Sequence, residues 1–262
     1  MITVYGRMPV LEALLDRRAV VEQLIVARSA RGESVERILA AAAARNVRVE
    51  RADAHRVTRI SRNGRQDQGV VADVASPRLA ELDEWLAAHP SGAVALIVLD
   101  GLTNPANAGM IIRSAVGAGL DGVVLPRAGS PEVGPLVVKA SAGIALWAPI
   151  MRVTTAAEAA RALMAAEVTV MGLRAGQGQP LWEAEIPERV ALVVGNETDG
   201  VSPRVASLAS SWCTVPLAGG VESLNVASAA AVVAFELARR RSLPAGEGNR
   251  TGLLTSPRGA GG

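Results

Sequence analysis

Three short stretches carry polar residues that could do chemistry, each close to glycine and an apolar run. They are N-P-A-N-A-G at 104–109, G-N-E-T-D-G at 195–200 and V-E-S-L-N at 221–225. Amides, a carboxylate and a hydroxyl in such places can hydrogen-bond a polar ligand, and glycine lets the backbone approach it closely. Taken one at a time, each stretch is equally explained by helix capping or by a solvated turn.

Other reaction classes lack the residues that they need. Two histidines, His55 and His89, and one cysteine, Cys213, are too few for a His/Cys zinc site, and we predict no metal. No P-loop motif occurs, and no histidine lies near a candidate nucleophilic serine in an elbow motif. G-A-G-L-D-G at 117–122 matches a dinucleotide-binding pattern, but it follows a helix pattern and precedes a strand pattern. We interpret its glycines as helix-ending residues.

The three stretches lie where predicted strands end. From residue 93 onward, short apolar runs such as A-V-A-L-I-V-L-D-G at 93–101 alternate with helical patterns. This alternation predicts an α/β fold whose mostly parallel sheet is covered on both faces. In such a sheet, ligands bind beyond the carboxyl ends of the strands, which is where the polar stretches are placed.

Pattern and composition divide the chain into four parts. Residues 1–75 alternate strand and helix patterns and predict a small α/β domain. Residues 76–92 hold one amphipathic helix between proline-containing turns and predict a linker. Residues 93–242 form the larger predicted α/β domain, and the Gly/Pro-rich tail at 243–262 is predicted to be disordered.

The charge is unevenly distributed along the chain. Residues 1–78 hold 14 basic and 9 acidic residues, or +5, and the remainder holds 13 against 16, or −3. Arginine-rich surfaces pair well with phosphates, although an ordinary solvated surface would explain the same excess.

No apolar run reaches the roughly 20 residues of a membrane span, and the N-terminus lacks the order of a secretory signal. With its single cysteine, the chain is predicted to be cytoplasmic and to contact no membrane.

Together and in this order, the three stretches match a known set of motifs. N-P-x-N-x-G-x-x-x-R at 104–113, G-N-E-x-x-G at 195–200 and V-P-L followed by V-E-S-L-N-V-A at 215–227 resemble the motifs of the SpoU (TrmH) methyltransferases of the SPOUT superfamily. The resemblance implies methylation of a ribose 2′-hydroxyl in RNA with S-adenosylmethionine as cofactor. It also implies a C-terminal trefoil knot and a homodimer with cofactor sites near the interface.

The front part is similar to a smaller module of the same family. V-Y-G-R-M-P-V-L-E-A-L-L at 4–15 and D-Q-G-V-V-A-D-V at 67–74 resemble the L30e-like substrate-binding domain of the 23S rRNA guanosine methyltransferases. This similarity implies 23S rRNA as the partner and a guanosine as the target. The basic residues that we expect to contact RNA phosphates are Arg7, Arg59, Arg62 and Arg65.

The resemblance also implies roles for single residues. The expected catalytic residues are Asn107, Arg113, Glu197, Ser223 and Asn225, and the expected cofactor-binding residues are Gly195, Asn196, Val215, Leu217, Leu224 and Asn225. The family pattern gives Arg113 the activation of the ribose hydroxyl. Because a guanidinium is a poor base, we expect Arg113 to position the ribose and a phosphate, with Glu197 and Asn107 holding it.

Other functions stay open at this point. An antibiotic-resistance methylase acting on another 23S nucleotide or a tRNA methylase would carry the same motifs, although the long basic terminal extensions of tRNA-specific relatives are absent. A catalytically silent RNA-binding assembly factor is the alternative outside the enzymes, and retention of the polar motif residues argues against it. Thr198 and Asp199 depart from the family pattern, and the Asp199 carboxylate would repel phosphate unless it pairs with an arginine.

Overall fold

The computed structural model describes residues 1–77 and 79–242, so the tail predicted at 243–262 lies outside the described residues. The N-terminal unit contains a four-stranded sheet in the order β1-β4-β2-β3, in which only β2 and β3 are parallel. Its strands are β1 Ile2–Tyr5, β2 Val21–Ala27, β3 Arg48–Ala52 and β4 Val70–Val74. Its helices are α1 Arg7–Leu15, α2 Glu33–Ala44 and α3 Ala54–Ser61.

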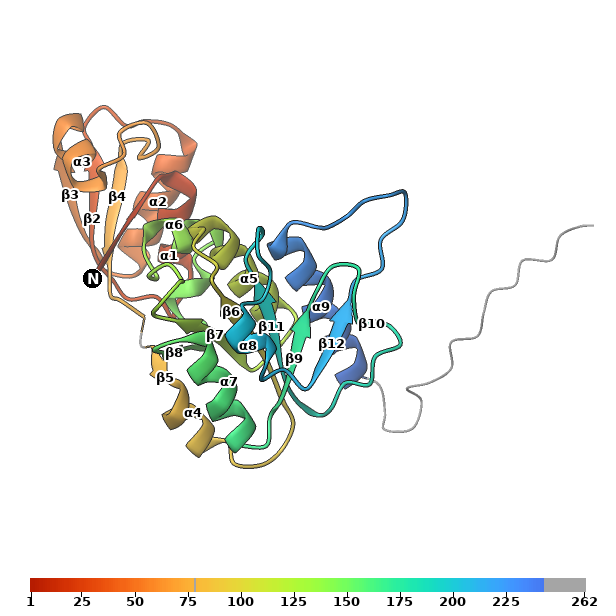
Figure 1. Ribbon diagram of the computed structural model, residues 1–262. Coiled ribbons are helices and arrows are strands. Elements are labelled where there is room, and N and C mark those ends of the chain that lie inside the picture. Colours follow the sequence, from red (N-terminus) through yellow and green to blue (C-terminus); the bar gives the residue numbers. More distant parts are fainter. Residues whose placement is uncertain (78, 243–262) are drawn as a thin grey trace, which may run out of the picture.

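The larger unit is built on an eight-stranded sheet whose neighbouring strands all pair in parallel, in the order β10-β12-β9-β11-β6-β7-β8-β5 (Figure 1). The strands are β5 Ala80–Glu81, β6 Val94–Asp100, β7 Gly122–Pro126, β8 Ile150–Val153, β9 Thr169–Leu173, β10 Gln179–Pro180, β11 Arg189–Gly195 and β12 Ser211–Thr214. This sheet confirms the predicted α/β class. The trefoil knot and the L30e-like fold of the N-terminal unit stay predictions.

Helices cover both faces of the large sheet. The helices α5 Pro105–Gly117, α6 Pro135–Ala140 and α9 Val226–Arg241 pack on one face together with the short 3₁₀ helix η1 Ile144–Leu146. The helices α4 Leu82–Ala88, α7 Ala156–Ala165 and α8 Pro203–Ala206 pack on the other. All of β6 is buried, with Ile97 facing one helical layer and Val98 the other, because successive side chains of a strand point to opposite faces.

The segment 76–92, predicted as a linker, contains ordered elements of the large sheet. β5 pairs with β8, and the α4 residues Leu82 and Leu86 are buried in the same core as α7. The domain boundaries themselves stay a prediction.

The N-terminal unit and the larger unit contact each other: Lys139 Nζ donates to Gln66 Oε1 at 2.9 Å, and the Arg18 guanidinium lies over the Trp147 ring.

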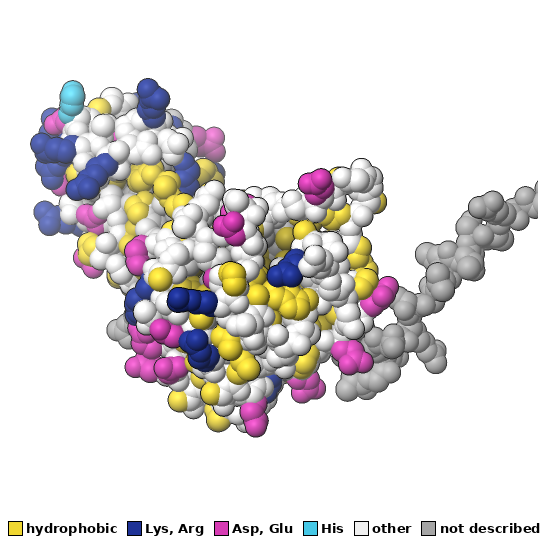
Figure 2. Space-filling model, viewed as in Figure 1, with side chains coloured by type: hydrophobic (Ala, Val, Ile, Leu, Met, Phe, Trp, Pro, Cys, Tyr) yellow, Lys and Arg dark blue, Asp and Glu magenta, His cyan; other side chains and the backbone are white. Residues whose placement is uncertain are grey.

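The surface repeats the charge distribution of the sequence. Figure 2 shows lysine and arginine side chains gathered on the outer end of the N-terminal unit. Among the described residues, we find no helix whose length and apolar character would let it span a membrane.

A buried carboxylate orients the arginine that attaches α9 to the segment 181–184. Glu236, which is 8% exposed, accepts hydrogen bonds from Arg239 and Arg240 at distances of 2.7–2.8 Å. Arg240 also donates to the carbonyl oxygens of Ala184 and Leu181, both at 2.6 Å. The hydrogen bonds from Arg239 above all hold the pKa of Glu236 below its usual value of 4.5.

We expect Glu236→Gln to lower the free energy of unfolding at pH 7 by about 1–3 kcal/mol, because two guanidinium groups lose their charged partner. Since the folded-state pKa of Glu236 is depressed, its contribution is present above pH 4.5 and is lost as the pH falls through the folded-state value. Urea unfolding at several pH values measures this. The exposed Glu183→Gln is the control, and equal acid sensitivity in wild type and Glu236→Gln would contradict the prediction.

Candidate functional site

The three polar stretches meet through one chain of hydrogen bonds. The Asn107 side-chain amide donates to the Glu197 carboxylate, and Asn225 Nδ2 donates to Asn107 Oδ1 at 3.3 Å. Asn107 is only 4% exposed, whereas Glu197 and Asn225 are exposed. A buried amide is stable only when its donors and acceptor are satisfied, so Asn107 fixes the relative positions of all three stretches.

Helix capping directs two of these side chains. Asn104 Oδ1 accepts from the Ala106 backbone N–H at 2.9 Å and so caps α5, which leaves Asn107 free to turn inward. Asn225 Oδ1 accepts from the Ala227 N–H at 2.9 Å, so its amide nitrogen faces Asn107. Asn225, and not the nearby Ser223, therefore caps α9.

The G-N-E-T-D-G stretch forms a tight hairpin that folds back on its own strand. Asn196 and Gly200 exchange two backbone hydrogen bonds of 3.1 Å, and Asn196 Oδ1 accepts from the Asp199 N–H at 2.7 Å. A Cβ atom on Gly195 would collide with the Gly200 carbonyl group, and Gly200 has a φ of 69°. The spacing of the two glycines is therefore dictated by this close approach, and it places Glu197 at the tip of the turn.

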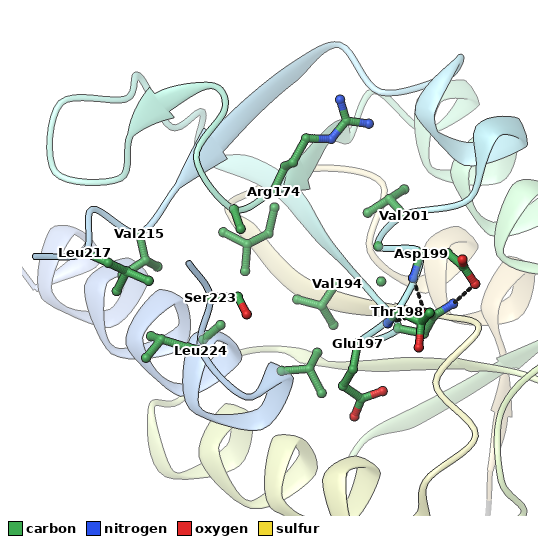
Figure 3. Close-up of a pocket in the computed structure, with 17 residues that line it drawn as sticks. Arg174, Val194, Glu197, Thr198, Asp199, Val201, Val215, Leu217, Ser223 and Leu224 are labelled. Carbon is green, nitrogen blue, oxygen red and sulfur yellow. Dashed lines mark hydrogen bonds between the residues drawn. The ribbon is translucent and has the colours of Figure 1, made fainter. Parts of the chain in front are cut away.

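A cavity of about 300 Å³ lies between this hairpin and the segment that leads into α9. Figure 3 shows Val215, Leu217 and Leu224 on one side of it, Glu197 on the other and Ser223 between them. Of the expected cofactor-binding residues, five line the cavity: Gly195, Asn196, Val215, Leu217 and Leu224. Asn225 stands between the lining residues Leu224 and Val226, but its side-chain amide donates to Asn107 instead. Within the described ranges, no group of three or more acidic, His or Cys side chains could hold a metal ion.

Arg113 does not join this cluster within the chain. It lies exposed on α5, six residues after Asn107, and forms no hydrogen bond or ion pair with any described residue, so Glu197 and Asn107 do not hold it. Its charged neighbour is Glu12 of α1, whose pKa is raised by burial and lowered in part by the Arg113 charge. The fold of one chain therefore brings together four of the five expected catalytic residues.

The expected RNA-binding arginines all lie in the N-terminal unit. Arg7 donates to Ser34 Oγ at 3.0 Å, Arg59 belongs to α3, Arg62 ends that helix with a φ of 53°, and Arg65 follows in the next loop. Ser34 lies within the first turn of α2 and does not cap it, because that helix begins after Gly32.

The N-terminal unit has a second basic feature, which was not predicted from the sequence. A cavity of about 460 Å³ is lined by Arg28, Arg31 and Arg51, with Glu36 as its acidic member. The pairing of Ala27 with Ala52 in the parallel strands β2 and β3 brings Arg28 and Arg51 together. Arginines at equivalent ends of two neighbouring strands were the signal that could have revealed it.

Comparison with known proteins decides the family. A family model described as the SpoU rRNA Methylase family matches residues 95–235, which include all three polar stretches. The chain belongs to this family. A second model, described as RNA 2'-O ribose methyltransferase substrate binding, matches residues 3–80. The resemblance inferred from the motifs is thereby confirmed.

Relatives and solved structures agree with this assignment. The chain is 36% identical over 182 residues to the 23S rRNA (guanosine-2'-O-)-methyltransferase RlmB of Xylella fastidiosa, covering 69% of this chain and 73% of the relative. An AdoMet-bound rRNA methyltransferase from Sinorhizobium meliloti aligns with a TM-score of 0.70 and 27% identity, over 93% of this chain and 88% of that one. The AdoMet complex of AviRb from Streptomyces viridochromogenes, at 24% identity and a TM-score of 0.73 over 91% and 89% of the two chains, shows the same fold.

The hairpin geometry gives a direct test. We expect Gly195→Ala to lower the free energy of unfolding by about 2–4 kcal/mol, because the added methyl group must displace the Gly200 backbone. Gly117→Ala is the matched control: its Cβ would lie 4.0 Å from Phe235 in an α-helix, where alanine is tolerated. Denaturant unfolding measures both variants, and equal stabilities would show that the hairpin has room for a Cβ atom at position 195.

Proposed function

We propose that this protein transfers a methyl group from S-adenosylmethionine to a ribose 2′-hydroxyl of RNA, with a guanosine of 23S rRNA as the target. The observation that carries the proposal is the hydrogen-bonded chain Asn225–Asn107–Glu197, which joins the three family motifs beside the cavity. The names of the curated RlmB relatives and the AdoMet-bound rRNA methyltransferase from Sinorhizobium meliloti support it. Action on ribosomal RNA would place the protein in the cytoplasm.

The residues of the cavity fit the proposed cofactor. Leu217 and Leu224 are each 37% exposed, so the cavity offers apolar surface that an adenine ring would cover. Val215 follows β12 directly and lines the same cavity, and Gly195 and Asn196 offer backbone groups without a large side chain in the way. When bound, S-adenosylmethionine supplies an electrophilic methyl group on a sulfonium.

The protein's own contribution is to position the ribose. Glu197 is held by Asn107 and can accept a hydrogen bond from a ribose hydroxyl, while Ser223 and Asn225 shape the cavity between cofactor and ribose. In-line transfer depends mainly on such positioning. Arg113 would orient the ribose and an adjacent phosphate, and the hydroxyl proton would leave to that phosphate, because the guanidinium stays protonated and cannot accept it.

A homodimer would bring the missing arginine to the site. Arg113 shares the exposed side of α5 with Met110, which is 41% exposed, and α5 packs beside α9, where Phe235 is 55% exposed. Exposed apolar side chains grouped on two neighbouring helices are typical of an interface. We therefore propose that α5 and α9 form the dimer contact and that Arg113 of one protomer serves the cavity of its partner.

RNA binding would fall to the N-terminal unit. The family model for this unit is described as substrate binding, and its basic side chains include the proposed contacts Arg7, Arg59, Arg62 and Arg65. The Arg28, Arg31 and Arg51 cavity adds a concave basic feature to the same unit. Guanidinium groups spread over one surface suit the phosphates of a folded RNA.

The first test of the proposal is cofactor binding and methyl transfer. Wild-type protein should bind S-adenosylmethionine in isothermal titration and methylate a protein-free 23S rRNA transcript at one ribose. Glu197→Gln should retain cofactor binding but lose roughly 100-fold in transfer rate, because a neutral amide oxygen accepts a hydrogen bond from the ribose hydroxyl more weakly than a carboxylate does. Glu183→Gln is the control. Absence of cofactor binding in the wild type would favour a silent RNA-binding factor.

The composite site has its own test. Arg113→Ala and Glu197→Ala subunits, each inactive alone, should regain about a quarter of wild-type activity when co-expressed, because half of the dimers then contain one intact site of two. Tandem purification on two affinity tags isolates the mixed dimer, which should show about half of wild-type activity because one of its two sites is intact. A mixed dimer as inactive as its parents would place Arg113 and Glu197 in the same protomer's site.

A further inference from the structure

A second cavity opens on the other side of the 196–200 hairpin. It measures about 830 Å³ and lies among the carboxyl ends of β6, β9 and β11 and the start of α8. Its polar lining consists of Asp100, Arg174, Asn196, Asp199, Ser202 and Ser207. A wide cavity with hydroxyls, carboxylates and one cation suits a solvated nucleotide backbone better than an apolar ring.

Arg174, the cation of this cavity, is held in place by an aromatic platform. Its guanidinium carbon lies 4.2 Å from the centroid of the Trp212 ring. A Cβ on Gly172 would collide with that ring, and one on Gly178 would lie 2.6 Å from the Trp212 carbonyl oxygen, so the tryptophan is closely seated. Stacking on an aromatic face orients a guanidinium and leaves its N–H edge available.

The guanidinium has donors left for a ligand. Its Nη1 donates to Gln177 Oε1 at 3.0 Å, and no described carboxylate forms an ion pair with it. Asp100 is already engaged, because its Oδ2 accepts from the Ser202 N–H at 2.7 Å. In Figure 3 the Arg174 side chain extends away from Ser223 and Leu224, and so away from the apolar wall of the first cavity.

The hairpin connects this cavity to the proposed ribose site. Glu197 accepts from Asn107 beside the first cavity, and Asp199, two residues later, lines the second. Arg174, Asn196, Asp199, Gly200 and Val201 line both cavities, so the two adjoin at the hairpin. A strand whose target ribose lies at Glu197 would therefore place its neighbouring nucleotide in the second cavity.

We propose that the second cavity binds the RNA backbone next to the target nucleotide, and that Arg174 pairs with the phosphate there. This inference rests on the proposed methyl transfer to RNA. A ribose 2′-hydroxyl of the same nucleotide donates to the Asp199 carboxylate, a contact that DNA could not make. The carboxylate that departs from the family pattern thus gains a partner, while the phosphate charge is met by Arg174.

The test is the salt dependence of RNA binding. Arg174→Ala should weaken binding of a protein-free 23S rRNA transcript by about five- to tenfold at low salt and reduce the slope of log affinity against log salt by about one. The KM for RNA should rise while kcat is retained, and the Kd for S-adenosylmethionine should not change. Arg174→Lys should keep most of the slope, because the charge remains, and Trp212→Leu should give an intermediate loss of affinity.

Arg161→Ala is the matched control, because it removes the same charge from the exposed side of α7, outside both cavities. A wild-type salt slope in Arg174→Ala would overturn the inference. So would weaker binding of S-adenosylmethionine with unchanged binding of its decarboxylated analogue, since Arg174 would then pair with the cofactor carboxylate. A wild-type protein that neither binds the cofactor nor methylates RNA would instead contradict the proposed function.

Discussion

The site depends on satisfying one buried amide. Asn107 is almost fully enclosed, and an unpaired amide there would destabilise the fold by about 1–3 kcal/mol. Its nitrogen donates to Glu197 and its oxygen accepts from Asn225, residues 90 and 118 positions away in the chain. The native structure is therefore favoured only when the start of α5, the hairpin after β11 and the start of α9 come together. The requirement that positions the reactive groups is also a requirement for stability.

The parallel sheet makes this meeting possible. β6 and β11 are hydrogen-bonded neighbours whose last residues, Asp100 and Gly195, are paired in register. Both strands consequently deliver their loops to the same edge, one leading to Asn107 and the other to Glu197. The hairpin must then bend sharply without leaving the sheet, and the glycine at 195 allows it because no Cβ obstructs the returning backbone. The pattern of apolar strands and glycines in the sequence encodes this arrangement.

What the sequence could predict follows the strength of its local signals. The continuous apolar run of β6 and the alternating strands and helices after it predicted the sheet correctly. The two-residue strands β5 and β10 are too short to show a period, and only pairing with β8 and β12 defines them. Capping was less predictable: Asn225 rather than Ser223 caps α9 because its amide must also reach Asn107, a contact that no local pattern contains.

Long-range pairing also explains which site residues were found. The motif residues were predicted because they recur together in one family, and the structure brings Asn107, Glu197 and Asn225 into contact. Arg174 belongs to no motif, and its relation to Trp212 arises from the pairing of β9 with β12, which sets Gly172 opposite Trp212. A glycine that faces a tryptophan on the neighbouring strand leaves no recognisable pattern in the sequence. It becomes visible only when the register is known.

The two walls of the first cavity differ in how they are held. One wall is the sheet edge and its hairpin, fixed by paired backbone hydrogen bonds. The other is the segment 215–225, in which a single backbone hydrogen bond joins two of its own described residues, from Val221 to Ala218 at 3.4 Å. Backbone without internal hydrogen bonds is the part of a fold that opens most easily. Leu217 and Leu224, on this second wall, would gain burial when a ligand covers them, so ligand binding and ordering of this wall should favour each other.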